Sequence, residues 1–208
     1  MHTTVIDYGA GNLTSVLLAL SSIGVPATVA RTPEDINRSD RIIFPGVGAA
    51  GAAMRNLINS GTSDAIRGHI AAGRPFLGIC IGMQLLFDFS EEDGGTPCMG
   101  LIPGSVTRFR PASTKIKIPH MGWNEVTCRL PHPVFEGIPD STEFYFVHSY
   151  YPQPADETHC IAETSYSDTL FASSAGYKNV ISVQFHPERS GRYGLTFLKN
   201  FISWNPQC

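Results

Sequence analysis

The sequence carries little charge for its length. Only 16% of its 208 residues are Asp, Glu, Lys or Arg, and the formal net charge is −3; a typical domain has about 25% charged residues. A basic surface for nucleic acid is therefore not expected. No apolar run reaches the roughly 18 residues of a membrane span, because the best candidate, residues 76–89, is interrupted by Gly78, Gly82 and Gln84. The first residues lack the basic and apolar regions of a signal peptide, so none is expected.

Metal and cofactor motifs are also missing. The five cysteines, at positions 80, 98, 128, 160 and 208, are odd in number and form no C-x-x-C pair. A zinc or disulfide-exchange site is thus not predicted, and free thiols favour a reducing compartment, which indicates the cytoplasm. The sequence has no G-x-x-x-x-G-K-[ST] phosphate loop. We expect neither a metal nor a cofactor.

The first half of the chain alternates short apolar strands with helical segments. The predicted strands are 4–6, 27–30, 41–44 and 74–79, and the predicted helices are 13–20, 49–58, 64–72 and 81–87. Pro45-Gly46 is expected to end the third strand. This alternation predicts an α/β fold with a mostly parallel central sheet flanked by helices, in a flavodoxin-like arrangement.

The second half of the chain has a different pattern. Of the 20 glycines, 15 lie in residues 1–104. After Gly104, β-rich segments at 105–109, 124–127, 143–147, 159–163, 170–173 and 180–185 predict an antiparallel portion that rejoins the main sheet. A final amphipathic helix is predicted over 193–204, with Leu195, Leu198, Phe201 and Ile202 inward. Since no linker or repeat is visible, we expect one domain spanning 1–208.

The most informative segment surrounds Cys80. An apolar strand leads into Gly78-Ile79-Cys80-Ile81-Gly82 and then into a helix. This G-x-C-x-G pattern is the thiol counterpart of the nucleophile elbow, in which glycines allow strand and helix backbones to approach closely. The sulfur would lie at a helix N-terminus, where the dipole favours a thiolate. Free cysteines are usually buried structural residues, and that interpretation is kept for the other four.

A base for Cys80 is predicted at His186. The residue follows the apolar strand 180–185 and precedes Pro187-Glu188. Positions i and i+2 of an extended segment point the same way, so Glu188 can orient the imidazole. Alone, the segment would be read as a surface His-Pro turn. His120 and His148 are the rival bases, although a histidine in an apolar strand is usually a hydrogen-bonded core residue.

Taken together, these motifs resemble the triad-type (class I) glutamine amidotransferases. The resemblance rests on residues 78–84 and 184–188, and also on 6–13, 45–49, 119–124 and 145–150. The last two segments and the P-G-V-G sequence are similar, more narrowly, to the amidotransferase subunits of histidine biosynthesis. Ala50 and Ile81 depart from the usual pattern without touching a predicted catalytic atom. The match is weak over 164–179, so no role is carried over there.

The resemblance implies a glutaminase. Cys80 would attack the side-chain amide of glutamine, His186 would transfer the proton and Glu188 would orient His186. Gly46, Val47 and Gly48 would form an oxyanion strand. The residues implied in glutamine binding are Gln84, His148, Ser149 and Tyr150.

The resemblance also implies a partner. Ammonia would pass, within a heterodimer, to a barrel-type cyclase subunit that makes imidazole glycerol phosphate and aminoimidazole carboxamide ribotide. Candidate partner-facing or gating residues are Asn12, Lys117, Pro119, Met121, Trp123 and Tyr145. For Met121 and Trp123, ordinary core packing is an equal alternative, and Asn12 could instead cap a helix.

Three other functions stay open from sequence alone. An amidotransferase of the same build could serve another acceptor, such as an amidino-sugar or vitamin B6 pathway. A regulatory relative with a decayed site is opposed by the intact Cys80, His186 and Glu188. A Cys-His peptidase or hydrolase on a similar sheet is opposed by Gln84 and P-G-V-G.

Overall fold

The computed structural model describes residues 2–9, 13–113 and 115–206, which form two β-sheets flanked by helices. In chain order the elements are β1 (Thr3–Ile6), α1 (Leu13–Ser22), β2 (Ala27–Ala30), α2 (Pro33–Asn37), β3 (Arg41–Gly46), α3 (Ala50–Asn59), α4 (Thr62–Ala71), β4 (Phe76–Cys80), α5 (Ile81–Gln84), β5 (Phe89–Ser90), β6 (Thr96–Pro97), β7 (Gly104–Arg108), β8 (His120–Cys128), β9 (Thr142–His148), β10 (Tyr150–Pro154), β11 (Cys160–Tyr166), β12 (Thr169–Tyr177), β13 (Val180–Val183) and α6 (Gly191–Ser203).

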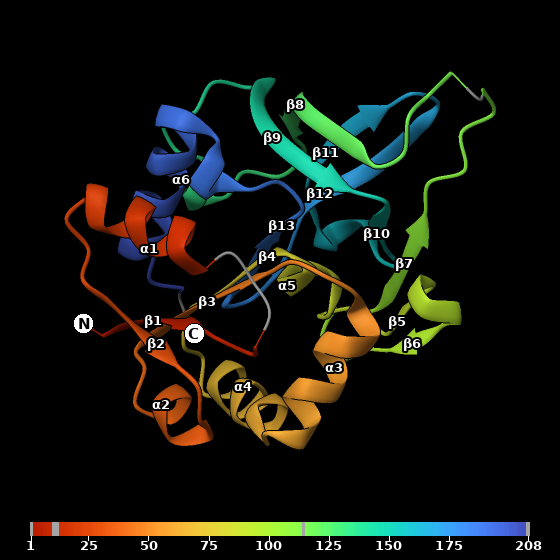
Figure 1. The fold of residues 1–208 in the computed structure, drawn as a ribbon. Helices are drawn as coiled ribbons and strands as arrows, with labels where there is room; N and C mark the ends of the chain where they lie inside the picture. Colours follow the sequence, from red (N-terminus) through yellow and green to blue (C-terminus); the bar gives the residue numbers. More distant parts are fainter. Residues whose placement is uncertain (1, 10–12, 114, 207–208) are drawn as a thin grey trace.

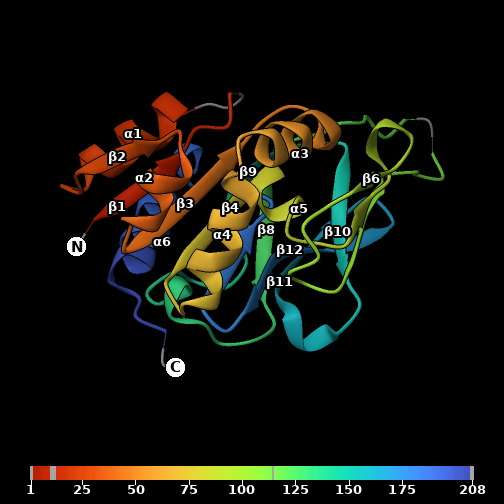
Figure 2. The same cartoon turned by 90° about the horizontal axis from the view of Figure 1, so that it is seen from below.

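The larger sheet has nine strands in the order β2-β1-β3-β4-β13-β12-β11-β8-β9. Neighbours from β2 to β13 run parallel, and from β13 to β9 they run antiparallel. Helices α1 and α6 cover one face, and α2, α3 and α4 cover the other (Figures 1 and 2). The predicted α/β class, and the antiparallel portion that rejoins the parallel sheet, are both confirmed.

Burial explains why the central strands read as continuous apolar runs. Strands β1, β3, β4 and β13 are buried at every position, because helices cover both faces of the sheet. The interior accordingly divides into two apolar clusters. One contains the buried faces of α1 and α6, and the other those of α2, α3 and α4.

A second, smaller sheet was not expected. It has the order β10-β7-β5-β6 and stands at the side of the molecule beyond α3 (Figure 1). The sequence pattern correctly indicated β7 but placed it in the antiparallel part of the main sheet. Strands β5 and β6 have two residues each, which is too short for any periodicity to be visible.

The prediction that β3 ends before Pro45 is wrong. The strand continues to Gly46, with Pro45 opposite Ile79 and Gly46 opposite Cys80 on β4. On its other side, the pairing of β3 with β1 reaches only Ile43. Pro45 therefore lies where the ladder toward β1 has already stopped, and its missing N–H costs no hydrogen bond there.

Two helices also differ from expectation. The predicted helix over 81–87 shortens to α5, because the N–H groups of Leu86 and Phe87 bond to the carbonyls three residues back, of Met83 and Gln84, and the α-helical pattern stops there. The carbonyls of Leu85 and Leu86 then accept hydrogen bonds from the 99–102 segment. Helix α2 was missed, although Thr32 and Asp35 form a capping box around Pro33.

Helix α6 is locked to the sheet by a buried arginine. The Arg41 guanidinium donates to the carbonyls of Phe201 and Trp204 at 2.7 and 2.8 Å. At its other end, α6 begins so close to the preceding turn that a Cβ on Gly194 would lie 1.9 Å from the Pro187 carbonyl oxygen. The helix thus supports the turn that carries Glu188. Leu195 and Ile202 are only partly buried, and Phe197 contributes to the core in addition to Leu198 and Phe201.

No helix in the described ranges is both long enough and apolar enough to cross a membrane.

Candidate active site

The candidate site lies where three neighbouring strands end. Gly46 at the end of β3 pairs with Cys80 at the end of β4, and β13 runs parallel to β4 up to the pair Val183 and Ile79. Ligand sites of open α/β sheets form at these carboxyl ends. A cavity of about 340 Å³ opens there, lined by Val47, Gly48, Cys80, Ile81, Gln84, Glu92, Pro119, Val147, His148, Ser149, Tyr150 and His186.

Cys80 occupies a strained turn between β4 and α5. Its backbone has φ 55° and ψ −110° and forms the N-cap of α5, a conformation that costs a non-glycine residue about 1–3 kcal/mol. A Cβ on Gly82 would lie 1.9 Å from the Phe44 carbonyl oxygen, and one on Gly78 would lie 2.6 Å from that of Gly82. The structure therefore confirms that both glycines are required by close backbone approach, as the elbow motif predicted.

His186 and Glu188 form a buried pair beside Cys80. Nδ1 of His186 lies 2.8 Å from Oε1 of Glu188, and the side chains are only 4% and 2% exposed. Burial alone would lower the pKa of His186, but the neighbouring Cys80 and the Glu188 carboxylate outweigh it and raise this pKa to about 10. The other ring nitrogen, Nε2, has no hydrogen-bond partner among the described residues. A buried imidazole oriented in this way has its second ring nitrogen available to exchange a proton with the neighbouring thiol.

The segment after β3 is shaped by its glycines and by Tyr8. Gly48 has φ +97°, which a residue with a side chain rarely adopts, and a Cβ on Gly46 would lie 2.7 Å from the Tyr8 hydroxyl oxygen. That hydroxyl donates to the Val47 carbonyl at 3.1 Å. Val47 and Gly48 line the cavity. The hydrogen bond from Tyr8 therefore fixes the position of a segment that forms part of the cavity.

The rival histidines form a neutral pair. Nδ1 of His148 lies 2.8 Å from the Tyr150 carbonyl, which can only accept, so the hydrogen is on Nδ1. His148 Nε2 then accepts from Nδ1 of His120 at 3.0 Å. Burial lowers the pKa of His148 to about 3 and that of His120 to about 4. Both nitrogens of His148 are thus engaged within the protein, which leaves His186 as the histidine with a free nitrogen at the cavity.

Comparison with known proteins places this geometry in a family. The model for glutamine amidotransferase class-I matches residues 4–204. The imidazole glycerol phosphate synthase subunit HisH of Aromatoleum aromaticum is 48% identical over 97% of this chain and 98% of its own length. HisH of Nitrosococcus oceani is 46% identical over 97% of this chain and 96% of its own length. The chain belongs to the class-I glutamine amidotransferases, within the HisH family.

Solved structures support the same fold at low sequence identity. A glutamine amidotransferase structure has a TM-score of 0.73 and 19% identity, and covers 96% of this chain and 98% of its own. PurLQS from Thermotoga maritima has a TM-score of 0.74 and 17% identity, with 97% of each chain covered. At such identities the likeness concerns the class-I amidotransferase fold alone.

Most residues that sequence analysis assigned to this amidotransferase site lie around one cavity. Cys80, His186, Gln84, His148, Ser149, Tyr150, Val47 and Gly48 line it. Gly46 lies opposite Cys80 in the sheet, and Glu188 lies behind His186. The individual roles of these residues stay predictions.

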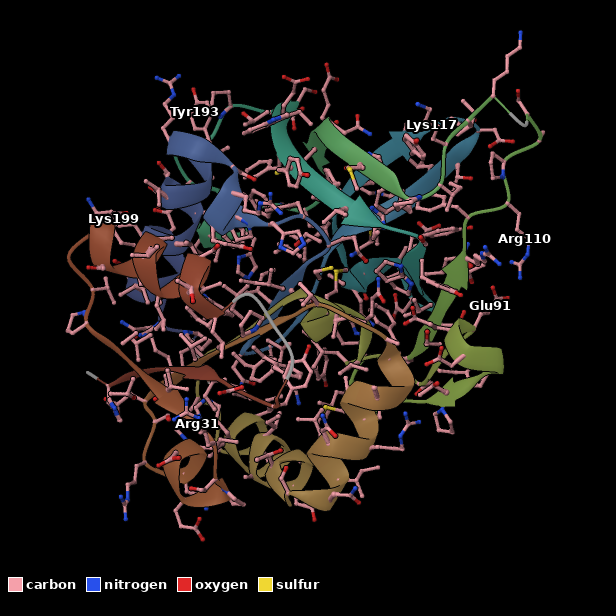
Figure 3. All side chains as sticks on the ribbon, viewed as in Figure 1. Arg31, Glu91, Arg110, Lys117, Tyr193 and Lys199 are labelled. Carbon is pink, nitrogen blue, oxygen red and sulfur yellow. The ribbon has the colours of Figure 1, made fainter. Side chains whose placement is uncertain are left out.

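The candidate partner-facing residues lie beside the cavity, on or near β8 and β9. Met121 and Trp123 are 62% and 53% exposed, so ordinary core packing does not account for them. Trp123 contacts Tyr145 across the two strands, with ring centroids 6.2 Å apart. Pro119 lines the cavity, and Lys117 is exposed on the segment before β8 (Figure 3). Asn12 lies outside the described residues.

Three residues at the site were not singled out from sequence. Glu92 lines the cavity and accepts a hydrogen bond from the Ala50 backbone N–H. Tyr8 supports Val47, and Gln184 contacts Cys80 directly. Gln184 stands in the Q-F-H-P-E segment, yet its contact depends on strand register and has no local signal. Among the described residues, no group of three or more His, Cys, Asp or Glu is placed to hold a metal.

Proposed function

We propose that this chain hydrolyses L-glutamine to glutamate and ammonia at Cys80, and delivers the ammonia to a barrel-type cyclase subunit of imidazole glycerol phosphate synthase. The observation that carries the proposal is the convergence of a strained Cys80 and the buried His186–Glu188 pair on one cavity. A thiol, a base and a group that orients the base are the elements of acyl transfer.

The chemistry follows from the positions of these groups. His186 takes the thiol proton on Nε2, and the sulfur attacks the amide carbon of glutamine. Backbone N–H groups of residues 46–48 and of Ile81, after the nucleophile, stabilise the oxyanion. His186 then protonates the departing ammonia, and water hydrolyses the glutamyl thioester with His186 again as the base. No metal or cofactor enters these steps.

The cavity also offers groups for the amino-acid end of glutamine. Glu92 is the one carboxylate among the described residues that line it, and it suits the α-ammonium of the substrate. Gln84 uses its side-chain N–H groups on Tyr150 and Gln184, so its amide oxygen remains an acceptor. Ser149 and Tyr150 also line the cavity. Because both ring nitrogens of His148 are engaged, we assign that residue to the shape of the pocket.

The partner interface is proposed on the exposed side of β8 and β9. Trp123 and Met121 lie on β8, and their cross-strand neighbours on β9 are Tyr145 and Val147. Val147 lines the cavity, so Met121 on β8 lies directly across from a residue at the proposed site of ammonia release. The relatives named as imidazole glycerol phosphate synthase subunits favour a cyclase partner over other acceptors. A cytoplasmic location suits the four free cysteines of the described residues.

Glutamate release by the full chain tests the proposal. We expect very low activity for the chain alone and a large increase with the cyclase and its substrate or a product analogue. Cys80→Ala should abolish release, and a variant that still hydrolyses glutamine would refute the nucleophile. If the pair forms product from ammonium salts but not from glutamine, this chain is not the ammonia source. High activity without a partner would contradict the proposed dependence on the cyclase.

A further inference from the structure

A fully buried amide touches the sulfur of Cys80. Gln184 follows the last pair of β13 and β4, Val183 with Ile79, so it continues the row that also contains Gly46 and Cys80. Its side chain is completely buried. Nε2 of Gln184 donates to Sγ of Cys80 at 3.5 Å. The donor therefore reaches the reacting atom from the neighbouring strand.

The orientation of this amide is determined by its neighbours. The Tyr150 carbonyl can only accept, so the group of Gln84 that lies 3.0 Å from it is the nitrogen. The same nitrogen lies 2.9 Å from the Gln184 side chain, which must therefore present its oxygen there. A flipped Gln184 would place two N–H donors against each other. Nε2 of Gln184 is thereby directed at Cys80.

The carbonyl at the start of this chain of hydrogen bonds is itself well anchored. It accepts a second hydrogen bond from Nδ1 of His148, and His148 is held by His120. His120 in turn lies 3.2 Å from the Asn124 side-chain nitrogen. Because the Tyr150 carbonyl can only accept, each following hydrogen bond in this row runs in one direction, from Asn124 to His120 and from His120 to His148. The amide of Gln184 is consequently preorganised, and it need not be reoriented when the sulfur becomes charged.

We propose that Gln184 is a catalytic residue of the glutaminase site, which holds the Cys80 thiolate through its side-chain N–H and is itself oriented by Gln84 and the Tyr150 carbonyl. The proposal rests on the proposed function, in that Cys80 is taken as the nucleophile. A thiolate is a much better acceptor than a thiol, because hydrogen bonds to charged groups are stronger. The N–H group of Gln184 therefore stabilises the reactive form and aims the sulfur, while His186 exchanges the proton.

The pH dependence of Cys80 alkylation by iodoacetamide tests this role in the full chain, without a partner. Gln184→Met keeps the length and burial of the side chain but has no N–H. We expect the midpoint of the pH–rate profile to move up by about one unit, since one hydrogen bond to a charged group is lost. With the cyclase present, kcat for glutamine should fall about 10- to 100-fold, while KM changes less than about threefold.

Asn179→Leu is the matched control. Asn179 is a buried amide just before β13 that donates to the carbonyls of Ile70 and Arg74, and its removal should lower stability without moving the alkylation midpoint. A Gln184→Met midpoint equal to that of the wild type would overturn the proposal. If the wild-type chain is not alkylated at Cys80, the proposed function fails instead.

NMR of the wild-type chain tests the same proposal without any substitution, so its result does not depend on whether a variant folds. The side-chain amide resonances of Gln184, observed by NMR with labelled glutamine, should titrate with the same midpoint as Cys80 alkylation. They should also shift when Cys80 is alkylated. If the Gln184 resonances change neither with the titration of Cys80 nor with its alkylation, the residue only packs against the site, and the proposal is wrong.

Discussion

Replacing Glu188 by glutamine isolates the electrostatic contribution of the triad, because it changes the charge and keeps the shape. Oε1 of Glu188 lies 2.8 Å from Nδ1 of His186, and both side chains are almost fully buried. Oε2 has no hydrogen-bond partner among the described residues. The imidazole of His186 is thus the main group that this carboxylate stabilises.

The expected magnitude follows from the strength of that contact. A hydrogen bond to a charged group contributes about 1.5–3 kcal/mol and a neutral one about 0.5–1.5 kcal/mol. The Glu188→Gln substitution therefore removes roughly 1–2 kcal/mol from the imidazolium, or about one pKa unit. The pKa of His186, now raised to about 10, should fall by that amount.

The tautomer of His186 adds a second effect. An amide at position 188 can turn its NH₂ group toward Nδ1, and a ring that accepts there carries its hydrogen on Nε2. Such a ring cannot take the proton of Cys80. A misassigned tautomer costs up to about 10⁴-fold in kcat, so the loss for Glu188→Gln should lie between about 10-fold and this limit.

Glutamate release with the cyclase present measures this loss. Glu163→Gln is the control, because it removes the same charge from an ion pair with Arg129 in which both side chains are partly exposed, and surface pairs contribute little. We expect kcat to be unchanged by Glu163→Gln and at least tenfold lower in Glu188→Gln. Equal activity of the two variants would refute the role assigned to Glu188.

Three further predictions concern the frame of the site. Gly82→Ala should destabilise the fold by at least about 3 kcal/mol in denaturant unfolding, since its Cβ would meet the Phe44 carbonyl oxygen. Gly68→Ala on α4 is the control, because open space surrounds that position, and it should be neutral or slightly stabilising. Tyr8→Phe removes the hydrogen bond to Val47 and should lower kcat for glutamine about 5- to 10-fold with little change in melting temperature; an unchanged kcat would show that the hydroxyl is dispensable. In NMR titrations, the His148 ring should stay neutral down to about pH 4, since burial lowers its pKa to about 3. Because an unfolded histidine takes up a proton near pH 6.5, this ring should cost roughly 2 kcal/mol of stability at pH 5 relative to pH 7, and a His148 that titrates near 6.5 would contradict the buried pair.

The catalytic half of the site could be predicted because its signals are local. Gly78, Cys80 and Gly82 lie within five residues of one another, and His186 and Glu188 within three. Backbone sterics within one turn and the two-residue repeat of an extended segment relate such neighbours directly. The alternating pattern of the first half indicated the sheet that brings the two segments together.

Glu92 and the smaller sheet could not be predicted in the same way. Glu92 reaches the cavity from the region of β5 and β6, and those strands are too short to have a pattern. The weakly matching segment 164–179 forms parts of β11 and β12. Its Phe171 lies 5.2 Å from the His148 ring and 6.0 Å from the His120 ring, measured between centroids. Its contribution is tertiary packing, which residue spacing does not encode.

Gln184 illustrates the difference between a motif and a contact. The residue stands two positions before His186 and would be read from sequence as part of a buried strand. Its contact with Cys80 exists because β13 pairs with β4 in parallel, with Val183 beside Ile79. A shift of one residue in that register would point Gln184 to the opposite face of the sheet. The register that seats His186 near the thiol therefore also places an amide donor on the sulfur, and both would be lost together.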